Sequence, residues 1–257
     1  MFTIVNLPII SLRAEANERS EMVSQLLFGQ QIEILEKQEK WFYVKNLTDE
    51  YEGWISANTV NQRHFTEKAV DTSKFKASKT PVLVCFKTSS VEKIMLPGGS
   101  MLPPTVREQF ELAGEIYQIA QLEPVYTKNN DGQLAVELAQ QYVNAPYLWG
   151  GKSVMGIDCS GLVQVVFSML GIFLPRNASQ QVEHGTVVDF LAEARPGDLA
   201  FFEDEEGFII HVGILINSHQ IIHASGVTKK EIIDSQGIIS SSTGEYSHHL
   251  RVIKRIL

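Results

Sequence analysis

Alternating apolar and polar residues fill most of the first sixty positions of the chain. Four runs carry the pattern, with the sequences IISLRAE, QQIEILEKQ, KWFYVKN and GWISANTV. A period of two is typical of β-strands that bury one face. Turn residues such as Asn17, Gly29 and Gly53 separate the runs. The pattern predicts a small all-β barrel, built from hairpins, over residues 1–65.

The segment that follows is less regular but still strand-like. Short apolar runs lie at residues 81–86, 93–96 and 115–119, and proline- and glycine-rich breakers interrupt them at residues 97–99 and 103–104. We interpret residues 66–128 as a second, degenerate barrel of the same kind.

The hydrophobic period lengthens after Gly132. Leu134, Leu138 and Tyr142 recur at near-helical intervals before Pro146 ends the predicted helix. A second helix is predicted over residues 160–170. Strand-like runs follow at residues 198–202, 208–216, 220–224 and 250–256. The pattern over residues 129–257 therefore predicts an α+β domain in which helices pack on an antiparallel sheet.

Composition and charge narrow the class of protein. The 257 residues are 44% hydrophobic and 20% charged, as in folded soluble domains, and the formal net charge is -8 at pH 7. Such a surface repels phosphate backbones and anionic lipids, so we expect no nucleic acid and no membrane as partners. The sequence shows neither a basic leader nor an apolar run of roughly 18 residues, and we expect a cytoplasmic monomer.

The two cysteines have different surroundings. Cys85 lies in the apolar run 82–86 and is interpreted as a core thiol. Cys159 comes directly before the amphipathic run 162–170, so it is predicted to start a helix. The positive end of the helix dipole favours a thiolate there, which predicts a lowered thiol pKa and a candidate nucleophile.

Two histidines are candidates for the partner of this nucleophile. His211 lies within an apolar run, which predicts a central strand, and His223 lies in the next strand. In a hairpin of even register the two rings share a face, and His223 would accept from Nδ1–H of His211 and fix its tautomer. A zinc site made of Cys159, His211 and His223, completed by Asp158 or water, is the chemical alternative. Because no second cysteine stands at ligand spacing, we expect no metal and no cofactor.

Several short motifs along residues 132–257 recur together in a known order. They are PYLWGG at 146–151, DCSG at 158–161, PRNASQ at 175–180, RPGDL at 195–199, HVG at 211–213 and HA at 223–224. With these motifs the region resembles the NlpC-type cysteine peptidases, a papain-like family that acts on cell-wall peptides. The resemblance implies a triad of Cys159, His211 and His223.

The first sixty residues carry a second resemblance. The opening LRAE at 12–15, the run WFYVKN and the closing YEGWI at 51–55 resemble a bacterial SH3-like domain. Together the two resemblances imply a papain-like α+β catalytic domain preceded by small all-β SH3-like barrel domains.

Relatives that combine these parts resemble γ-D-glutamyl-L-diamino acid endopeptidases of murein peptide recycling. The resemblance implies cleavage of L-Ala-γ-D-Glu-diamino acid peptides that have a free N-terminal L-Ala, where the third residue is meso-diaminopimelate or Lys. The Asp158 carboxylate would bind the ammonium group, and a capped peptide would leave its charge unsatisfied. The backbone N–H of Cys159 would serve as oxyanion donor, with help from Tyr147. The expected substrate contacts are Asp158, Ser160, Tyr147, Trp149, Ser179 and Tyr51.

Other interpretations of the same residues stay open. The scaffold fits an amidase or acyltransferase, or a non-catalytic module whose barrels bind a peptide. Asp158 could simply cap a helix, and Tyr51 could simply pack its barrel. Four other histidines in polar stretches are assigned no role, and they are His184, His219, His248 and His249. The presence of Cys159, His211 and His223 together favours catalysis.

Overall fold

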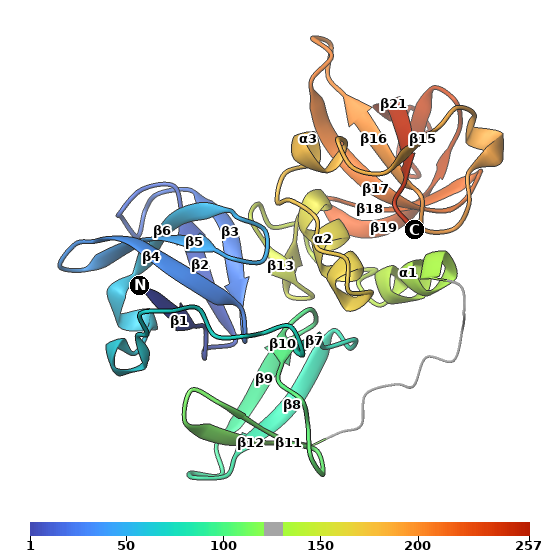
Figure 1. Cartoon of the computed structure of the whole chain (residues 1–257). Helices are drawn as coiled ribbons and strands as arrows, with labels where there is room; N and C mark the ends of the chain where they lie inside the picture. Colours follow the sequence, from blue (N-terminus) through green and yellow to red (C-terminus); the bar gives the residue numbers. More distant parts are fainter. Residues whose placement is uncertain (121–130) are drawn as a thin grey trace. The chain divides into compact units, whose positions relative to one another are not determined.

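The computed structural model of the chain describes residues 1–120 and 131–257 and divides them between two compact units (Figure 1). Unit 1 is Met1–Pro124 with Trp149–Val154, and unit 2 is Val125–Leu148 with Met155–Leu257. The predicted boundary between residues 128 and 129 lies outside the described residues.

Unit 1 begins with a six-stranded sheet of order β1-β4-β5-β6-β2-β3. Its elements are β1 (Phe2–Ile4), β2 (Ile9–Arg13), β3 (Met22–Leu27), β4 (Gln31–Lys37), β5 (Trp41–Asn46), β6 (Glu52–Ser56) and the 3-10 helices η1 (Ala57–Thr59) and η2 (Gln62–His64). The alternation in the sequence has its physical cause here, because Leu12, Val44 and Ile55 are completely buried in one cluster. The SH3-like region is thus made of strands with a barrel-like arrangement, as predicted.

The second part of unit 1 is built from two smaller sheets. A four-stranded sheet has the order β11-β12-β8-β9, and a two-stranded sheet pairs β10 with β7. The strands are β7 (Lys76–Ala77), β8 (Val82–Lys87), β9 (Lys93–Pro97), β10 (Met101–Leu102), β11 (Gln109–Leu112) and β12 (Glu115–Ile119). Phe28, which follows β3, packs edge-on against Phe110 and Tyr117 of this part. Cys85 is buried in the same cluster, as expected for a core thiol.

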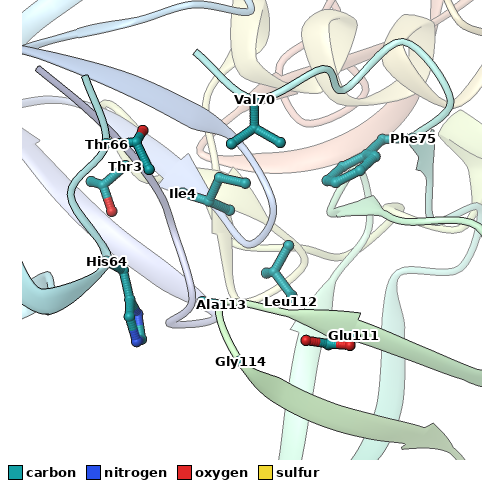
Figure 2. A pocket seen from close by; sticks show the side chains of 10 residues that line it. All are labelled: Thr3, Ile4, His64, Thr66, Val70, Phe75, Glu111, Leu112, Ala113 and Gly114. Atoms are coloured by element: carbon teal, nitrogen blue, oxygen red, sulfur yellow. The ribbon is translucent and has the colours of Figure 1, made fainter. Parts of the chain in front are cut away.

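An apolar cavity of about 350 Å³ lies in unit 1 beside β1 and the β11–β12 turn (Figure 2). Ile4, Val70, Phe75 and Leu112 supply its apolar lining, and His64 and Glu111 are its ionisable groups. The residues that line it include none of the site residues predicted from the sequence.

Unit 2 contains a seven-stranded antiparallel sheet of order β15-β21-β16-β17-β18-β19-β20. Strand β21 pairs with β20 as well as with β16, so six of these strands form a closed ring. The strands are β15 (Thr186–Val188), β16 (Leu199–Glu203), β17 (Ile209–Asn217), β18 (Gln220–Ser225), β19 (Val227–Ile233), β20 (Gly237–Ile239) and β21 (Tyr246–Arg255). The runs predicted at 198–202, 208–216, 220–224 and 250–256 correspond to β16, β17, β18 and β21.

Three helices accompany this sheet, and all three contact β17. They are α1 (Asp131–Gln140), α2 (Cys159–Met169) and α3 (Ala178–Gln181), with the 3-10 helix η3 (Leu191–Glu193) and the short strands β13 (Lys152–Ser153) and β14 (Gly156–Ile157) between other elements. Helix α2 is buried along nearly its whole length. Among the described residues, no helix is long and apolar enough to cross a membrane.

Candidate active site

Cys159 is the first residue of helix α2 and is 7% exposed. Asp158 caps the helix, because its carboxylate accepts from the backbone N–H of Gly161 at 2.7 Å. The apolar face that begins at Leu162 anchors the helix among buried residues and so fixes the position of its first turn. The sequence-predicted nucleophile therefore stands on a rigid element.

The prediction of a lowered thiol pKa for Cys159 was wrong. Burial, followed by the nearby charge of Asp158, raises the pKa of the thiol to about 11. Backbone hydrogen bonds with Val212 and Ser160, and the charge of Arg176, act in the opposite direction but do not compensate. The helix N-terminus is present, but loss of water around the sulfur outweighs its favourable field.

The carboxylate of Asp158 already has a cationic partner within the protein. The guanidinium of Arg176 donates to both of its oxygens, and the Arg176 Nη1 to Oδ1 distance is 3.0 Å. The same nitrogen donates to the hydroxyl of Ser160 at 2.7 Å. All three side chains are buried, so this is a satisfied ion pair beside the nucleophile. An ammonium group bound by Asp158 would therefore share this carboxylate with Arg176, and the role of Asp158 in substrate recognition remains a prediction.

His211 and His223 are brought together by the register of β17 and β18. Ile214 lies opposite Ile222, so odd-numbered residues of the two strands share a face. The His211 Nε2 atom is 2.9 Å from Nδ1 of His223, and both rings are buried. The prediction named the wrong nitrogen, because Nε2 of His211 makes this bond. Nδ1 of His211 takes no part in this bond. The next residue, Val212, has its backbone among the hydrogen-bond partners of the Cys159 thiol.

Gly213 makes room for this pair of rings. A Cβ atom at this position would lie 2.7 Å from Cδ1 of Ile221 and 3.0 Å from Cβ of His223. Both distances are shorter than ordinary carbon contacts, so a larger residue would push against the side chain of Ile221 and crowd Cβ of His223. The glycine of the His-Val-Gly motif is thus a packing requirement of the histidine pair.

Two residues near the histidine pair were missed by the sequence analysis. Glu231 on β19 accepts from His223, with 2.9 Å between Oε2 and Nε2. His248 on β21 stacks on the ring of His211, with ring centroids 4.1 Å apart. The alternation of β19 could have indicated Glu231, since this acidic residue shares the buried face of the strand with Ile233. Nothing in the sequence near His248 indicates that β21 reaches this part of the sheet.

The histidines also form the one candidate metal-binding group found in the described part of the chain. One ring nitrogen from each of His211, His223 and His248 lies within 4.8 Å of the others. The planes of His211 and His248 differ by only 26°, so the lone pairs of the two rings lie in nearly parallel planes. Convergence on a single tetrahedral ion would require one ring to rotate. This set differs from the one weighed from the sequence, which used Cys159.

The predicted substrate contacts fall in both units. In unit 2, Tyr147 is partly buried, and burial together with the charges of Cys159 and Asp158 raises the pKa of its hydroxyl to about 12. Ser160 is buried beside Asp158, and Ser179 is exposed on α3. In unit 1, Tyr51 packs against the core of the first sheet, and the indole of Trp149 donates to Glu21. The substrate roles of these residues remain predictions.

Comparison with known proteins identifies the family. Residues 144–253 match the model of the NlpC/P60 family, and residues 12–60 match that of the bacterial dipeptidyl-peptidase Sh3 domain. The chain is 30% identical to dipeptidyl-peptidase 6 of Lysinibacillus sphaericus over 249 residues, which cover 88% of each protein. The chain belongs to the NlpC/P60 family. This NlpC/P60 protein therefore has both of the domain types that the motifs predicted.

Two further relatives match most of this NlpC/P60 chain. The γ-D-glutamyl-L-lysine dipeptidyl-peptidase of Bacillus subtilis is 26% identical over 216 residues, which are 78% of this chain and 71% of that protein. The crystal structure of an NlpC/P60 family protein from Bacillus cereus has a TM-score of 0.84 and 17% identity, and the match covers 100% of both chains. At this identity the structural match shows a shared fold.

Proposed function

We propose that the chain is a cysteine peptidase, with Cys159 as nucleophile, His211 as base and His223 as the residue that orients the base. The observation that carries the proposal is the 2.9 Å bond between Nε2 of His211 and Nδ1 of His223. This bond directs the other ring nitrogen of His211, Nδ1, away from His223. The backbone of the adjacent residue, Val212, hydrogen-bonds with the sulfur of Cys159. A nucleophile, a base and an orienting group are the parts that covalent catalysis requires.

The protonation states determine how attack begins. The thiol has a pKa of about 11, and burial holds the pKa of His211 well below its ordinary value, so both groups are neutral near pH 7. We therefore propose general-base catalysis rather than a preformed thiolate–imidazolium pair. The thiol proton passes to Nδ1 of His211 while the sulfur attacks the carbonyl carbon of the substrate.

The remaining steps follow from this transfer. Collapse of the tetrahedral intermediate breaks the C–N bond, and His211 gives its proton to the leaving amine. The γ-carbonyl group of the D-Glu residue stays on the sulfur of Cys159 as a thioester. Water then adds to the thioester with His211 as base, and the thiol is regenerated with the carboxylate product. The backbone N–H of Cys159 at the start of α2 is the proposed oxyanion donor, and the Tyr147 hydroxyl assists it.

The proposed substrate is a cell-wall peptide cut between γ-D-Glu and a diamino acid. The name of the Bacillus subtilis relative, γ-D-glutamyl-L-lysine dipeptidyl-peptidase, supports this bond and supports lysine as the diamino acid. We further propose a free N-terminal L-Ala on the substrate and a role in murein peptide recycling in the cytoplasm. A papain-like arrangement of unit 2 belongs to the same proposal, supported by the contacts of α1, α2 and α3 with β17.

A peptide assay tests the proposal. Purified, reduced protein is incubated with L-Ala-γ-D-Glu-L-Lys and with the corresponding meso-diaminopimelate peptide, and the products are identified by mass. The expected products are L-Ala-D-Glu and the free diamino acid. An N-acetylated peptide is expected to react much more slowly. The matched variant Cys159→Ala is expected to give no product with either peptide.

The outcomes separate the proposed chemistry from the other functions that the scaffold fits. Release of ammonia from an amidated peptide, without cleavage after D-Glu, would indicate an amidase. Tight binding of the tripeptide without turnover by the wild-type protein would indicate a binding module. Equal product formation by wild type and Cys159→Ala would exclude Cys159 as the nucleophile.

A further inference from the structure

The buried carboxylate of Glu231 extends the histidine pair by one residue. Its Oε2 atom is 2.9 Å from Nε2 of His223, and neither side chain is exposed to solvent. The other oxygen, Oε1, accepts from the backbone N–H and the hydroxyl of Ser241 at 2.8 and 2.9 Å. The ammonium group of Lys229 lies 3.3 Å from the same oxygen. Both oxygens of the carboxylate therefore have partners, which fix its orientation.

The register of β18 and β19 places Glu231 beside His223. His223 lies opposite Lys229, and Ile221 lies opposite Glu231. Glu231 and His223 are thus diagonal neighbours on one face of an antiparallel pair, at a separation that long side chains can span. Their contact is a product of strand pairing and not of sequence proximity.

Glu231 is ionised near neutral pH. Burial alone raises the pKa of its carboxyl group, but hydrogen bonds from the Ser241 backbone, from His223 and from the Ser241 hydroxyl outweigh burial and lower it to about 2. An ionised carboxylate can only accept hydrogen bonds. The hydrogen between Glu231 and His223 must therefore be on Nε2 of His223.

This requirement determines the positions of the other hydrogens. Burial lowers the pKa of His223 to about 4, so the ring is neutral near pH 7 and carries one N–H. With that hydrogen on Nε2, Nδ1 of His223 is an acceptor, and Nε2 of His211 must donate to it. A neutral His211 with its hydrogen on Nε2 has a free lone pair on Nδ1, which is the form that can accept a proton.

We propose that Glu231 is a positioning residue that sets the tautomers of His223 and His211, so that Nδ1 of His211 is the base for Cys159. The inference rests on the proposed function, because it gives the tautomer a catalytic purpose. Glu231 touches no reacting atom and acts through His223. The other ionisable groups that act on His211 are His248, which stacks on its ring, and Lys229.

The variant Glu231→Gln tests the role with almost no change of shape. The amide of glutamine can donate to Nε2 of His223, which permits the opposite tautomer in both rings. His211 would then carry its hydrogen on Nδ1 and could not accept the thiol proton. We expect kcat for the tripeptide to fall by up to about 10⁴-fold, the loss known for the wrong tautomer in a triad, with little change in KM.

A control separates this effect from the loss of any carboxylate on the sheet. Glu203→Gln, on β16, also removes a carboxylate from the same sheet, where it pairs with Arg251 at 3.2 Å. We expect this variant to retain wild-type kcat. Equal loss of kcat in the two variants would overturn a specific role for Glu231, as would wild-type kcat in a folded Glu231→Gln protein.

A spectroscopic measurement tests the tautomers without substrate. Protein labelled with ¹⁵N-histidine is studied by long-range ¹H–¹⁵N correlation at pH 7.5, where protonated and unprotonated ring nitrogens have distinct shifts. The wild type is expected to carry the hydrogen on Nε2 in both His211 and His223, and Glu231→Gln is expected to move it to Nδ1. A wild-type spectrum with Nδ1–H in His223 would overturn the inference even if the variant does not fold.

This readout also distinguishes the two proposals from each other. If the protein shows the expected tautomers but cleaves no peptide, the inference about Glu231 stands and the proposed function is wrong. If the protein cleaves the tripeptide but shows the opposite tautomers, the proposed function stands and the role of Glu231 is wrong.

Discussion

Cys159 combines a helix N-terminus, which favours a thiolate, with a buried site beside Asp158, which disfavours one. The second effect is larger, and the pKa of the thiol is about 11. The buried Arg176 is the counter-charge to Asp158, and it reduces but does not cancel the repulsion that a thiolate would meet. The thiol is therefore protonated near pH 7, which agrees with the proposal that the nucleophile forms during the reaction rather than before it.

The pH dependence of alkylation tests this state of the thiol. With Cys85 replaced by Ser, the rate of Cys159 modification by iodoacetamide is expected to rise with pH toward a midpoint near 11, because only the thiolate reacts. Modification near pH 7 should be slow. A rate that is already at its plateau below pH 8.5 would contradict the neutral pair and indicate a thiolate stabilised by protonated His211.

Strand pairing, at the scale of elements, brings together the side chains of the proposed site in unit 2. Strand β17 contributes His211, β18 contributes His223 and β19 contributes Glu231, while α2 contributes Cys159. The hairpin between β17 and β18 fixes the first pair of rings, and Gly213 leaves the space that the pair needs. A change in this hairpin should therefore affect catalysis without touching a reacting group.

Gly213→Ala is the variant that tests the packing of the hairpin. The new Cβ would lie 3.0 Å from Cβ of His223, so we expect kcat to fall about tenfold to a hundredfold as the ring shifts. The overpacking should cost about 1–3 kcal/mol of stability in urea unfolding. Gly226→Ala is the control, since its Cβ would meet no atom within 4 Å although its φ of +71° disfavours alanine. The control should lose stability but retain kcat, and equal kcat losses would contradict the steric explanation.

Buried neutral histidines make the stability of the whole molecule dependent on pH. The pKa of His223 is lowered from 6.5 to about 4, so between these values the unfolded chain binds a proton that the folded protein excludes. The free energy of unfolding must therefore decrease as pH falls from 6.5 to 4. Glu231 adds a further loss as pH falls from 4.5 to about 2, because its carboxylate is protonated earlier in the unfolded chain.

Urea unfolding measured as a function of pH tests this dependence. Replacement His223→Gln is expected to remove the uptake of up to one proton on unfolding. The slope of the unfolding free energy between pH 6.5 and 4 should then decrease by up to about 1.4 kcal/mol per pH unit. The control His184→Gln removes an exposed histidine and should leave the slope unchanged. An unchanged slope in His223→Gln would show that His223 is not the group that excludes a proton.

The sequence by itself determined many of the strands, helix α2 and the candidate reactive residues. Alternation in the first sixty residues specified the strands of unit 1, because each strand buries one face. The apolar run after Cys159 specified helix α2 and put the thiol at its start. The period of two along β17 and β18 predicted that His211 and His223 share a face in a hairpin of even register, and the pairing of Ile214 with Ile222 supplies that register.

Only the tertiary structure decided the charges and contacts around these residues. The pKa of Cys159 depends on burial, and the pairing of Asp158 depends on Arg176, which is 18 residues away in the sequence. Glu231 reaches His223 through the register of β18 and β19, and His248 reaches His211 from β21. Local patterns fix the direction of a side chain, whereas desolvation and charge pairing depend on which distant segments pack against it.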